Sequence, residues 1–392
     1  MSIDTTAIPR QIWVLVSAAF LIALGYGLIS PIIPQYAQTF DVGMAAASAV
    51  VSIFAFFRLL FAPASGRLID ALGSRAVYLS GLILVALTTA ALSLARDYWQ
   101  ILALRGLAGV GSTMFTVSAM SLIVTFAPPR IRGRCSSVYA SAFLLGSILG
   151  PLLGSALAPL GLRVPFVLYG AALLVAAAVV WRRMPRGVDR PANEVTVPMA
   201  FREAFRDSAY RCALVSSFAH GWSNFGVRVA TLPLFAASFQ GSGAAAGLAL
   251  TSFAVGNAAC LQFSGRWADS LGRRPLIVSG LIVNGAATAA MGMTHGLVVL
   301  LLTSAMAGAG AGILNPAQQA VVADVVGEQR SGGRVLANFQ MAMDCGAILG
   351  PLVVGAVSQA WGFGWGFGLC GALTWLAALV WWWGRETLPG RK

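Results

Sequence analysis

The sequence predicts an all-α membrane protein of twelve transmembrane helices, arranged as two six-helix bundles related by pseudo-symmetry. Three observations lead to this fold class: an apolar composition, twelve apolar runs, and a repeat that relates the two halves of the chain. The 392 residues are 58% hydrophobic and only 10% charged, and the mean hydropathy is +0.80. Because soluble domains carry about 25% charged residues, this composition indicates a chain that lies in lipid.

The apolar runs have the length of membrane-spanning helices. A hydrocarbon core of about 30 Å needs about 20 apolar residues per helix. Runs such as residues 80–94 and 297–306 are apolar on every side, whereas a membrane β-barrel would show short alternating segments. The expected spans are 12–36, 44–66, 77–95, 98–125, 135–158, 165–183, 211–237, 244–265, 275–294, 297–323, 335–358 and 365–384.

The basic residues predict the topology. Only Arg96 and Arg163 fall in loops expected outside the cell, and Arg58, Arg105 and Arg228 lie within spans. The other basic residues fall on the opposite side, as expected for a protein with both termini in the cytoplasm. The net charge of +13 therefore reports topology and not a nucleic-acid partner. The first run is about 25 residues long and lacks a cleavage site, so we expect an uncleaved anchor in the inner membrane.

The two halves align at a nearly constant offset. The ten-residue segment 66–75 aligns with 265–274, and Phe54 aligns with Phe253, both at 199 residues. Gly150 aligns with Gly350 at 200 residues, so one residue is inserted between. We expect an N-terminal bundle (1–183), a cytoplasmic linker (184–208) and a C-terminal bundle (209–392), related by an axis along the membrane normal, with the substrate site between them at the midplane.

Four motifs resemble the major facilitator superfamily and, within it, the twelve-helix drug:proton antiporters. They are the loop segment 66–75 with its copy at 265–274, the arginine-containing run 104–111, the glycine- and proline-containing run 146–154, and the run GYGLISPIIP at 25–34. The resemblance covers nearly the whole chain and implies alternating access, with the run 146–154 pointing to export. Many relatives carry an acidic residue in the first helix, and this chain has none there.

Glycines of these motifs are expected to gate the conformational change. They permit tight turns and close helix contacts, and Asp70 can meet the positive N-terminus of a neighbouring helix, which the resemblance implies is the eleventh. The alternative is that the loop arginines only fix topology and the glycines only serve packing. The expected gating residues are Gly66, Asp70, Gly73, Arg75, Gly265, Asp269, Gly272, Arg274, Gly146, Gly150, Pro151 and Gly154.

Charged residues inside spans are the candidates for proton coupling, because each costs about 2.5–3.5 kcal/mol to insert. Arg58 and Asp344 lie at similar depth in helices that are neighbours in this family, so we expect them to pair in one state and to separate when Asp344 is protonated. The alternative is a static buried pair. Arg105 matches an arginine that relatives use for protons or substrate charge, or it is a structural tie. His220 is a weaker proton candidate, because a single histidine on an apolar helix more often serves packing.

Polar and aromatic residues within the spans predict an amphipathic substrate cavity, although many of them must serve helix packing. The expected lining is Tyr26, Phe54, Arg58, Tyr139, Phe143, Asn224, Arg228, Asn257, Asn315, Phe339 and Gln340. Five cysteines and two histidines show no metal-like spacing, so neither a metal nor a cofactor is expected.

Three functions are compatible with these features. The first is a proton-coupled exporter of amphipathic small molecules, acting as a monomer. The second is an uptake or exchange carrier for an anionic metabolite, which three membrane arginines against one membrane aspartate support. The third is a non-transporting sensor of the same fold, against which the paired loop motifs argue. An ATP-driven pump or other enzyme with a phosphate-binding loop is excluded, because that loop needs a lysine and the only lysine is Lys392.

Overall fold

A computed structural model describes residues 8–127, 131–185, 197–240, 243–327, 330–331 and 333–388. Nearly all of these residues are helical, as expected from the sequence. Their contacts divide the chain into two compact units, Met1–Ile32 with Ile53–Asn193 (unit 1) and Ile33–Ser52 with Glu194–Lys392 (unit 2). The segment Ile33–Ser52, expected in the N-terminal bundle, therefore packs with unit 2.

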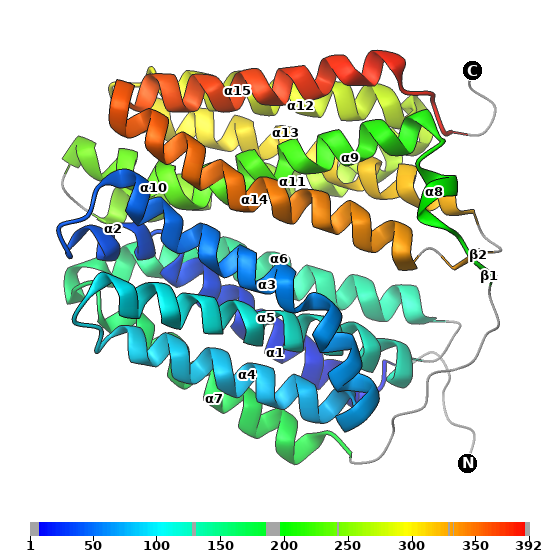
Figure 1. The fold of residues 1–392 in the computed structure, drawn as a ribbon, viewed down its shortest axis with the longest axis horizontal. Helices are drawn as coiled ribbons and strands as arrows, with labels where there is room; N and C mark the ends of the chain where they lie inside the picture. The colour runs from blue at the N-terminus through cyan, green and yellow to red at the C-terminus, as the bar shows by residue number, and fades with distance from the viewer. Residues whose placement is uncertain are drawn as a thin grey trace. The chain divides into compact units, whose positions relative to one another are not determined.

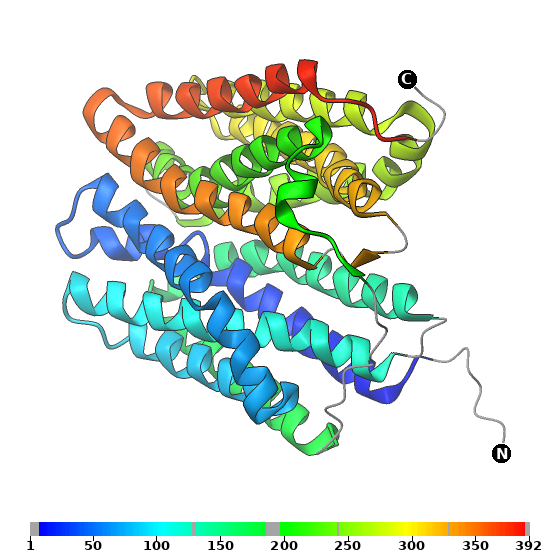
Figure 2. The same ribbon diagram turned by 45° about the vertical axis from the view of Figure 1, so that its right-hand side comes forward.

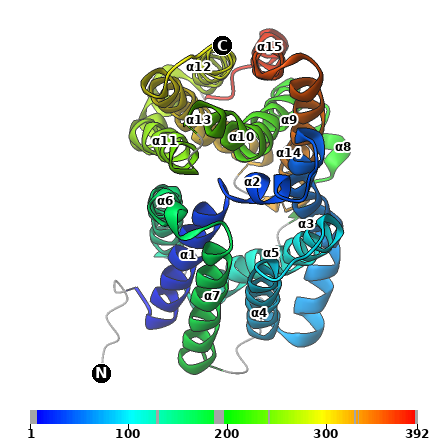
Figure 3. The same cartoon turned by 90° about the vertical axis from the view of Figure 1, so that its left-hand side faces the viewer.

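Unit 1 is a bundle of long helices, labelled in Figure 1. α1 packs against α6 and α7, and α4 packs against α5 and α7, as the end view of Figure 3 shows. The elements are α1 (Arg10–Ile29), the part of α3 (Met44–Leu72) from Ile53 onward, α4 (Ser74–Leu92), α5 (Tyr98–Phe126), α6 (Arg132–Leu157), the short η2 (Ala158–Leu160) and α7 (Val164–Arg183).

Unit 2 repeats this arrangement: α13 packs against α11 and α12, α12 against α15, and α14 against α9 and η3. α14 turns directly into α15 (Figure 2), and the one residue between them is Gly362, whose positive φ of 92° suits glycine. The elements are α2 (Ile33–Gln38), β1 (Val197–Pro198), α8 (Phe201–Ala204), α9 (Ser208–His220), η3 (Gly221–Val227), α10 (Arg228–Gln240), α11 (Gly243–Leu271), α12 (Arg273–Met291), α13 (Leu297–Val326), β2 (Arg330–Ser331), α14 (Gly333–Trp361), α15 (Phe363–Val380) and η4 (Trp381–Trp383). β1 and β2 form one short parallel pair.

Eleven described helices are long and apolar enough to cross a membrane. The remaining expected span, 211–237, is helical without a gap but is divided into α9, the π-helix η3 and α10, none of which reaches the length of a span alone. The first expected span, 12–36, was wrong as a single helix. It breaks after Ile29, where Pro31 lacks the N–H that would continue the ladder, and α2 begins at Ile33.

Helix surfaces show where lipid would lie. Large apolar side chains such as Leu60 and Leu376 are about three-fifths exposed, at 62% and 61%, while small and polar side chains lie inside each unit. A soluble protein would hide such residues, so the exposed faces fit a hydrocarbon environment.

Helix contacts confirm the repeat. A Cβ added at Gly111 would lie 2.8 Å from the carbonyl of Gly81, and one at Gly310 would lie 2.7 Å from that of Gly280, which is the same pair 199 residues later. The two units therefore share a skeleton of close helix crossings at glycine.

Candidate functional site

The charged centre of unit 1 is Arg105 on α5. Its guanidinium carbon lies 4.3 Å from the centre of the Phe54 ring of α3, a cation–π contact, and the Tyr26 ring of α1 lies 6.2 Å from that of Phe54. Tyr26 and Tyr169 of α7 are close enough to interact electrostatically with the guanidinium. We call Arg105, Phe54, Tyr26 and Tyr169 the unit 1 site.

Small residues on α5 bring α3 into position. A Cβ at Gly109 would crowd the carbonyl of Phe54 and lie 3.2 Å from the amide of Arg58, and the Thr113 hydroxyl donates to the Arg58 carbonyl at 2.7 Å. Because these residues share one helix face, α3 can approach α5 closely enough to place Phe54 against Arg105.

Arg105 is 3% exposed and makes no hydrogen bond or ion pair within the described part of the chain. Its Nε is buried without an acceptor. The Tyr169 hydroxyl nearby donates to the carbonyl of Ile22 at 3.2 Å. The unit 1 site thus holds a positive charge that aromatic rings cover, and no acidic side chain among the described residues forms an ion pair with it.

The charged centre of unit 2 is Arg228 at the start of α10. Its guanidinium carbon lies 3.8 Å from the centre of the Phe253 ring, and its Nε donates to the Asn224 carbonyl at 2.7 Å. This arginine therefore combines the cation–π contact with a hydrogen bond. A small cavity of about 10 Å³, enough for about one water molecule, lies beside it and is lined in part by Ser223, Thr288 and Phe367.

A buried polar network adjoins Arg228. His220 Nδ1 lies 2.9 Å from Asn224 Nδ2, and Asn284 donates to Asn224 Oδ1 at 3.3 Å and to the Ala307 carbonyl at 2.8 Å. Ser223 donates to Asn284 Oδ1 at 3.0 Å. His220 is thus a hydrogen-bonded interior residue, which is the alternative to its use as a proton carrier, and its coupling role stays a prediction.

The π-helix η3 carries two members of this network, Ser223 and Asn224. Such turns insert one extra residue into a helix and are frequent at functional sites. The sequence does not predict this π-helix, although a polar stretch within an otherwise apolar run marks its position.

Asp344 lies on α14, is 9% exposed, and accepts a hydrogen bond from Gln340 Nε2 at 3.3 Å. Phe339 is buried beside it in the chain, and its carbonyl accepts from Ser217. The expected pairing of Asp344 with Arg58 would join the two units and stays a prediction.

The other expected lining residues are scattered. Tyr139 lies near Tyr78, Phe143 is 43% exposed, and Asn257 and Asn315 are half-buried on α11 and α13. Within the described chain, no three His, Cys, Asp or Glu side chains come together as metal ligands.

The expected gating glycines of the two loop motifs differ in what requires glycine. Gly73 and Gly272 adopt φ values of 84° and 106° and each forms a one-residue turn between long helices. Gly66 and Gly265 have no atom within 4 Å of an added Cβ, so crowding does not explain glycine there. The side chains of Asp70 and Asp269 lie outside the part that the structure describes.

An arginine of each loop motif donates a hydrogen bond to a backbone carbonyl near the end of the last helix of its unit. Arg75 donates to the carbonyl of Trp181 at 2.7 Å, and Arg274, its repeat partner, donates to that of Trp382 at 3.2 Å. The arginines therefore have a structural contact in addition to any effect on topology.

The run 146–154 forms the contact between α6 and α1. An added Cβ at Gly146 or Gly154 would lie 2.6 Å from the carbonyl of Phe20 or Leu28, and one at Gly150 would lie 2.8 Å from Gly27 Cα. Pro151 packs on Gly27, and Pro351 packs likewise on Gly226 in unit 2. The predicted close packing at these glycines is present.

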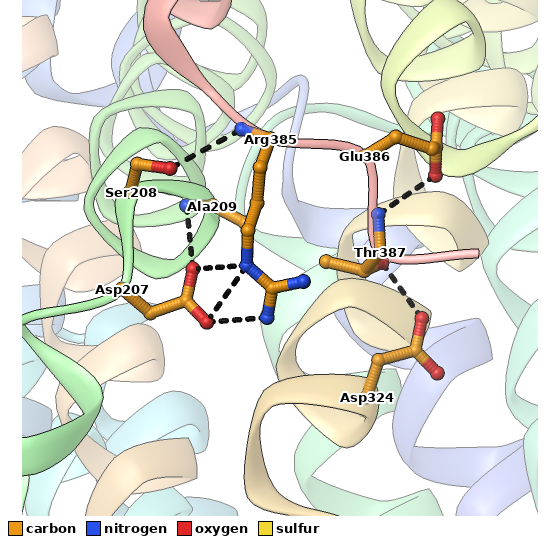
Figure 4. Close-up of polar contacts among 7 residues, drawn as sticks. All are labelled: Asp207, Ser208, Ala209, Asp324, Arg385, Glu386 and Thr387. Atoms are coloured by element: carbon orange, nitrogen blue, oxygen red, sulfur yellow. Dashed lines mark hydrogen bonds and ion pairs between the residues drawn. The ribbon is translucent and has the colours of Figure 1, made fainter. Parts of the chain in front are cut away.

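Residues 384–388, which follow η4, contact Asp207, Asp324 and the start of α12, and Figure 4 shows the contacts of Arg385 and Thr387. We call residues 384–388 the tail. Arg385 forms a two-pronged ion pair with Asp207, which caps α9 by accepting from the Ala209 amide at 2.9 Å. Thr387 donates to Asp324 at 2.7 Å.

The tail also caps α12. The Glu386 carboxylate accepts from the amides of Arg273 at 2.9 Å and Arg274 at 3.0 Å, the first two residues of that helix. Burial raises the pKa of Glu386, but the amides of Leu388, Arg273, Arg274 and Thr387 outweigh it and lower its pKa. The hydrogen bond with Asp207 raises the pKa of Arg385. No motif in the sequence predicted this cluster of contacts.

The sequence matches a family model and several proteins of known family. The family model described as Major Facilitator Superfamily matches residues 15–227 and 213–392. The chain is 23% identical over 350 residues to Multidrug resistance protein 1 of Bacillus subtilis, covering 87% of this chain and 88% of that protein. It is 28% identical over 162 residues to Quinolone resistance protein NorA of Staphylococcus aureus, a match that spans 41% of this chain and only 42% of that relative.

Solved structures agree on the fold. A bacterial homolog of the human lysosomal transporter Spinster, in an inward-facing and occupied conformation, has a TM-score of 0.82 at 17% identity and covers 95% of both chains. The human organic anion transporter MFSD10 (TETRAN) has a TM-score of 0.66 at 19% identity, covering 95% of this chain and 100% of that one. With its repeated bundles and its family match, the chain is a multi-pass membrane protein that belongs to the Major Facilitator Superfamily.

Proposed function

We propose that this transporter exports amphipathic small molecules by alternating access, driven by protons. The observation that carries the proposal is an arginine held against an aromatic ring in each repeat, Arg105 on Phe54 and Arg228 on Phe253, in a fold that binds substrates near the bilayer midplane. Rings and charges together suit molecules with an apolar body and a polar group. The resemblance to resistance proteins supports export.

The orientation belongs to the same proposal. The distribution of basic residues supports cytoplasmic termini, and the bacterial relatives support the inner membrane. Asp70 would then meet the start of α14 on the cytoplasmic side. A monomer is sufficient for this mechanism.

Asp344 is proposed as the coupling carboxylate, because it is the one acidic residue within the expected spans. Gln340 already donates to it at 3.3 Å, and a second donor, Arg58, would favour its charged form. Protonation would remove the charge and release Arg58. In this scheme each proton shifts the balance between two conformations.

The test is proton flux in liposomes that hold the purified chain and a pH-sensitive dye. With an imposed proton gradient, ethidium is expected to drive flux in the wild type, and Asp344→Asn is expected to abolish it. Asp41→Asn is the matched control, since it changes the same group at an exposed turn. Full ethidium-driven flux in both Asp344→Asn and Arg58→Ala would remove the coupling role.

A carrier for an anionic metabolite is the second candidate, favoured by the unneutralised charge of Arg105. It predicts flux with organic anions only, lost in Arg58→Ala or Arg105→Ala. Ethidium-driven flux would reject it.

A further inference from the structure

The segment before α9 carries a short amphipathic helix that the proposed transport mechanism does not use. α8 forms one turn, Phe201–Ala204, and the chain continues to turn through Arg206, whose amide donates to the Glu203 carbonyl at 3.2 Å. Ala204 is fully buried in the core of unit 2, whereas Phe201 is 38% and Phe205 is 47% exposed. The centres of the two rings lie 5.5 Å apart, so the rings form one exposed aromatic surface.

Contacts on both sides hold α8 in place. Before it, β1 pairs with β2, and after it the tail binds Asp207, which caps α9. The Phe201 ring packs edge-on against the Tyr210 ring with centres 6.3 Å apart, and the Tyr210 hydroxyl donates to the Val335 carbonyl of α14 at 2.7 Å. A helix this short is not stable alone in water, so these contacts fix where its side chains point.

The side chains of α8 point in four directions, because successive residues of a helix are turned by about 100°. Ala204 faces the core of unit 2, and the two phenylalanine rings come next around the helix. Arg202 and Arg206 follow, and Glu203 lies opposite the rings, all three exposed. This is the order expected for a helix at a bilayer surface beside its own bundle: rings toward the acyl chains, guanidinium groups at the phosphates and a carboxylate toward water.

α8 also lies where a bilayer surface is expected. Figure 3 shows it at the outer edge of unit 2 beside α14, and Figure 1 shows it at the end of unit 2 where α9 starts. Trp382 and Trp383 are 78% and 74% exposed and directly precede the tail, which binds Asp207 and the start of α12. Tryptophan is enriched at membrane–water interfaces, so this end of unit 2 lies at one.

We propose that α8 anchors the chain to the membrane surface. Phe201 and Phe205 insert into the leaflet on the side of the loop motif of unit 2, and Arg202 and Arg206 bind lipid phosphates. A guanidinium suits this partner because it can donate two N–H groups to one phosphate. Residues 197–207 are then fixed both to unit 2 and to the lipid, and the membrane surface sets the depth at which α9 begins. Neither the transported molecule nor proton coupling enters this role, which therefore goes beyond the proposed function.

The test places a bimane fluorophore on α8 of the full chain in lipid nanodiscs. Phe205→Cys puts the probe on the ring side, and Glu203→Cys is the matched control on the opposite side of the same turn. Wild type labelled in parallel gives the background from the five native cysteines. Quenching is measured with lipids spin-labelled near the headgroup and, separately, with iodide in water. Because the inserted face lies about 5–10 Å inside the headgroup boundary, the ratio of lipid to iodide quenching should be at least about threefold higher at 205 than at 203.

Charge reversal tests the contact with phosphates. In the chain labelled at 205, Arg202→Glu with Arg206→Glu should raise iodide quenching, because the phosphates would repel the two carboxylates and lift the helix. Arg182→Glu with Arg183→Glu reverses two exposed charges on α7 and is expected to leave the quenching at 205 unchanged. Equal iodide quenching with and without the α8 substitutions would overturn the phosphate contact.

Two results would overturn the anchor itself. One is a quenching ratio at 205 that is no higher than the ratio at 203, which would place the rings in water. The other is a probe at 205 that neither quencher reaches, which would place protein over the rings. If Phe205→Cys does not fold, Phe201→Cys takes its place on the same face, and the same results decide.

Discussion

The two units have the same packing skeleton and different chemistry inside it. Phe54 and Phe253 are 199 residues apart, and the ring of each lies against an arginine. Each phenylalanine also lies beside a glycine, Gly109 or Gly308, where an added Cβ would crowd the carbonyl of the phenylalanine. The arginines themselves are not repeat partners, because Arg105 comes from α5 and Arg228 from α10. The repeat thus fixes the ring and the close contact, while the charge has been placed independently in each unit.

The surroundings of the two arginines differ in polarity. His220, Ser223, Asn224 and Asn284 form the network of unit 2, and the positions 199 residues earlier are apolar: Leu21, Leu24, Gly25 and Val85. In unit 1 the Tyr169 ring fills the space over Gly25. Unit 2 therefore holds its arginine beside a hydrogen-bonded polar network, and unit 1 holds its arginine among aromatic rings.

The largest expected effect tests the shared skeleton. Gly150→Leu and Gly350→Leu should both abolish folded protein, because a Cβ would lie 2.8 Å from Gly27 Cα in one case and 2.8 Å from the Trp222 carbonyl in the other. Size-exclusion chromatography after extraction measures the folded fraction. Gly368→Leu is the matched control, since an added Cβ there meets nothing within 4 Å. If only one of the two variants failed to fold, the skeletons would not be equivalent.

A smaller effect tests the difference in polarity. Asn284→Leu should lower the free energy of unfolding by about 3 kcal/mol or more, because Ser223, Asn224 and the Ala307 carbonyl would each lose a buried partner. Val85→Asn, the reverse change in unit 1, should also destabilise, since no network receives the amide. Thermal unfolding in detergent measures both, with Ile282→Ala on the exposed face of α12 as control. A neutral Asn284→Leu would show that the network is dispensable.

The smallest effect concerns the tail, which caps α12 in unit 2. Glu386→Gln should lower the thermal midpoint at pH 7 by a few degrees, and the difference from wild type should shrink as the pH falls below the ordinary glutamate pKa. The lowered pKa of Glu386 sets this sign: its contribution is complete above the ordinary glutamate pKa and is lost as the pH falls through the folded value. The Glu386→Gln variant keeps Asp207 and Asp324, so its difference from the wild type isolates the contribution of Glu386. A difference that stays constant down to pH 3 would contradict the assignment.

Much of the fold could be predicted from the sequence because lipid imposes a length on every span. The spans at 98–125 and 165–183 end within about one residue of α5 and α7. The π-helix could not be predicted, because it accompanies contacts between residues some 60 positions apart, such as Ser223 with Asn284. The importance of Arg105 was visible from its charge in an apolar run, but its lack of an acceptor was not, since that depends on what neighbouring helices fail to provide. The sequence of the tail has no periodic pattern of apolar and polar residues, so its contacts could not be predicted from it.

The tail has a consequence for how the protein is made. Asp207 and the start of α12 leave the ribosome long before their partners, because Arg385 follows Asp207 by 178 positions and Glu386 follows Arg273 by 113. During synthesis, the start of α12 therefore stays uncapped by the tail, and Asp207 stays without its arginine, until α15 and η4 have been made. A stop codon placed just after η4 would leave every candidate membrane span intact and would still remove the carboxylate that caps α12 and the arginine that pairs with Asp207.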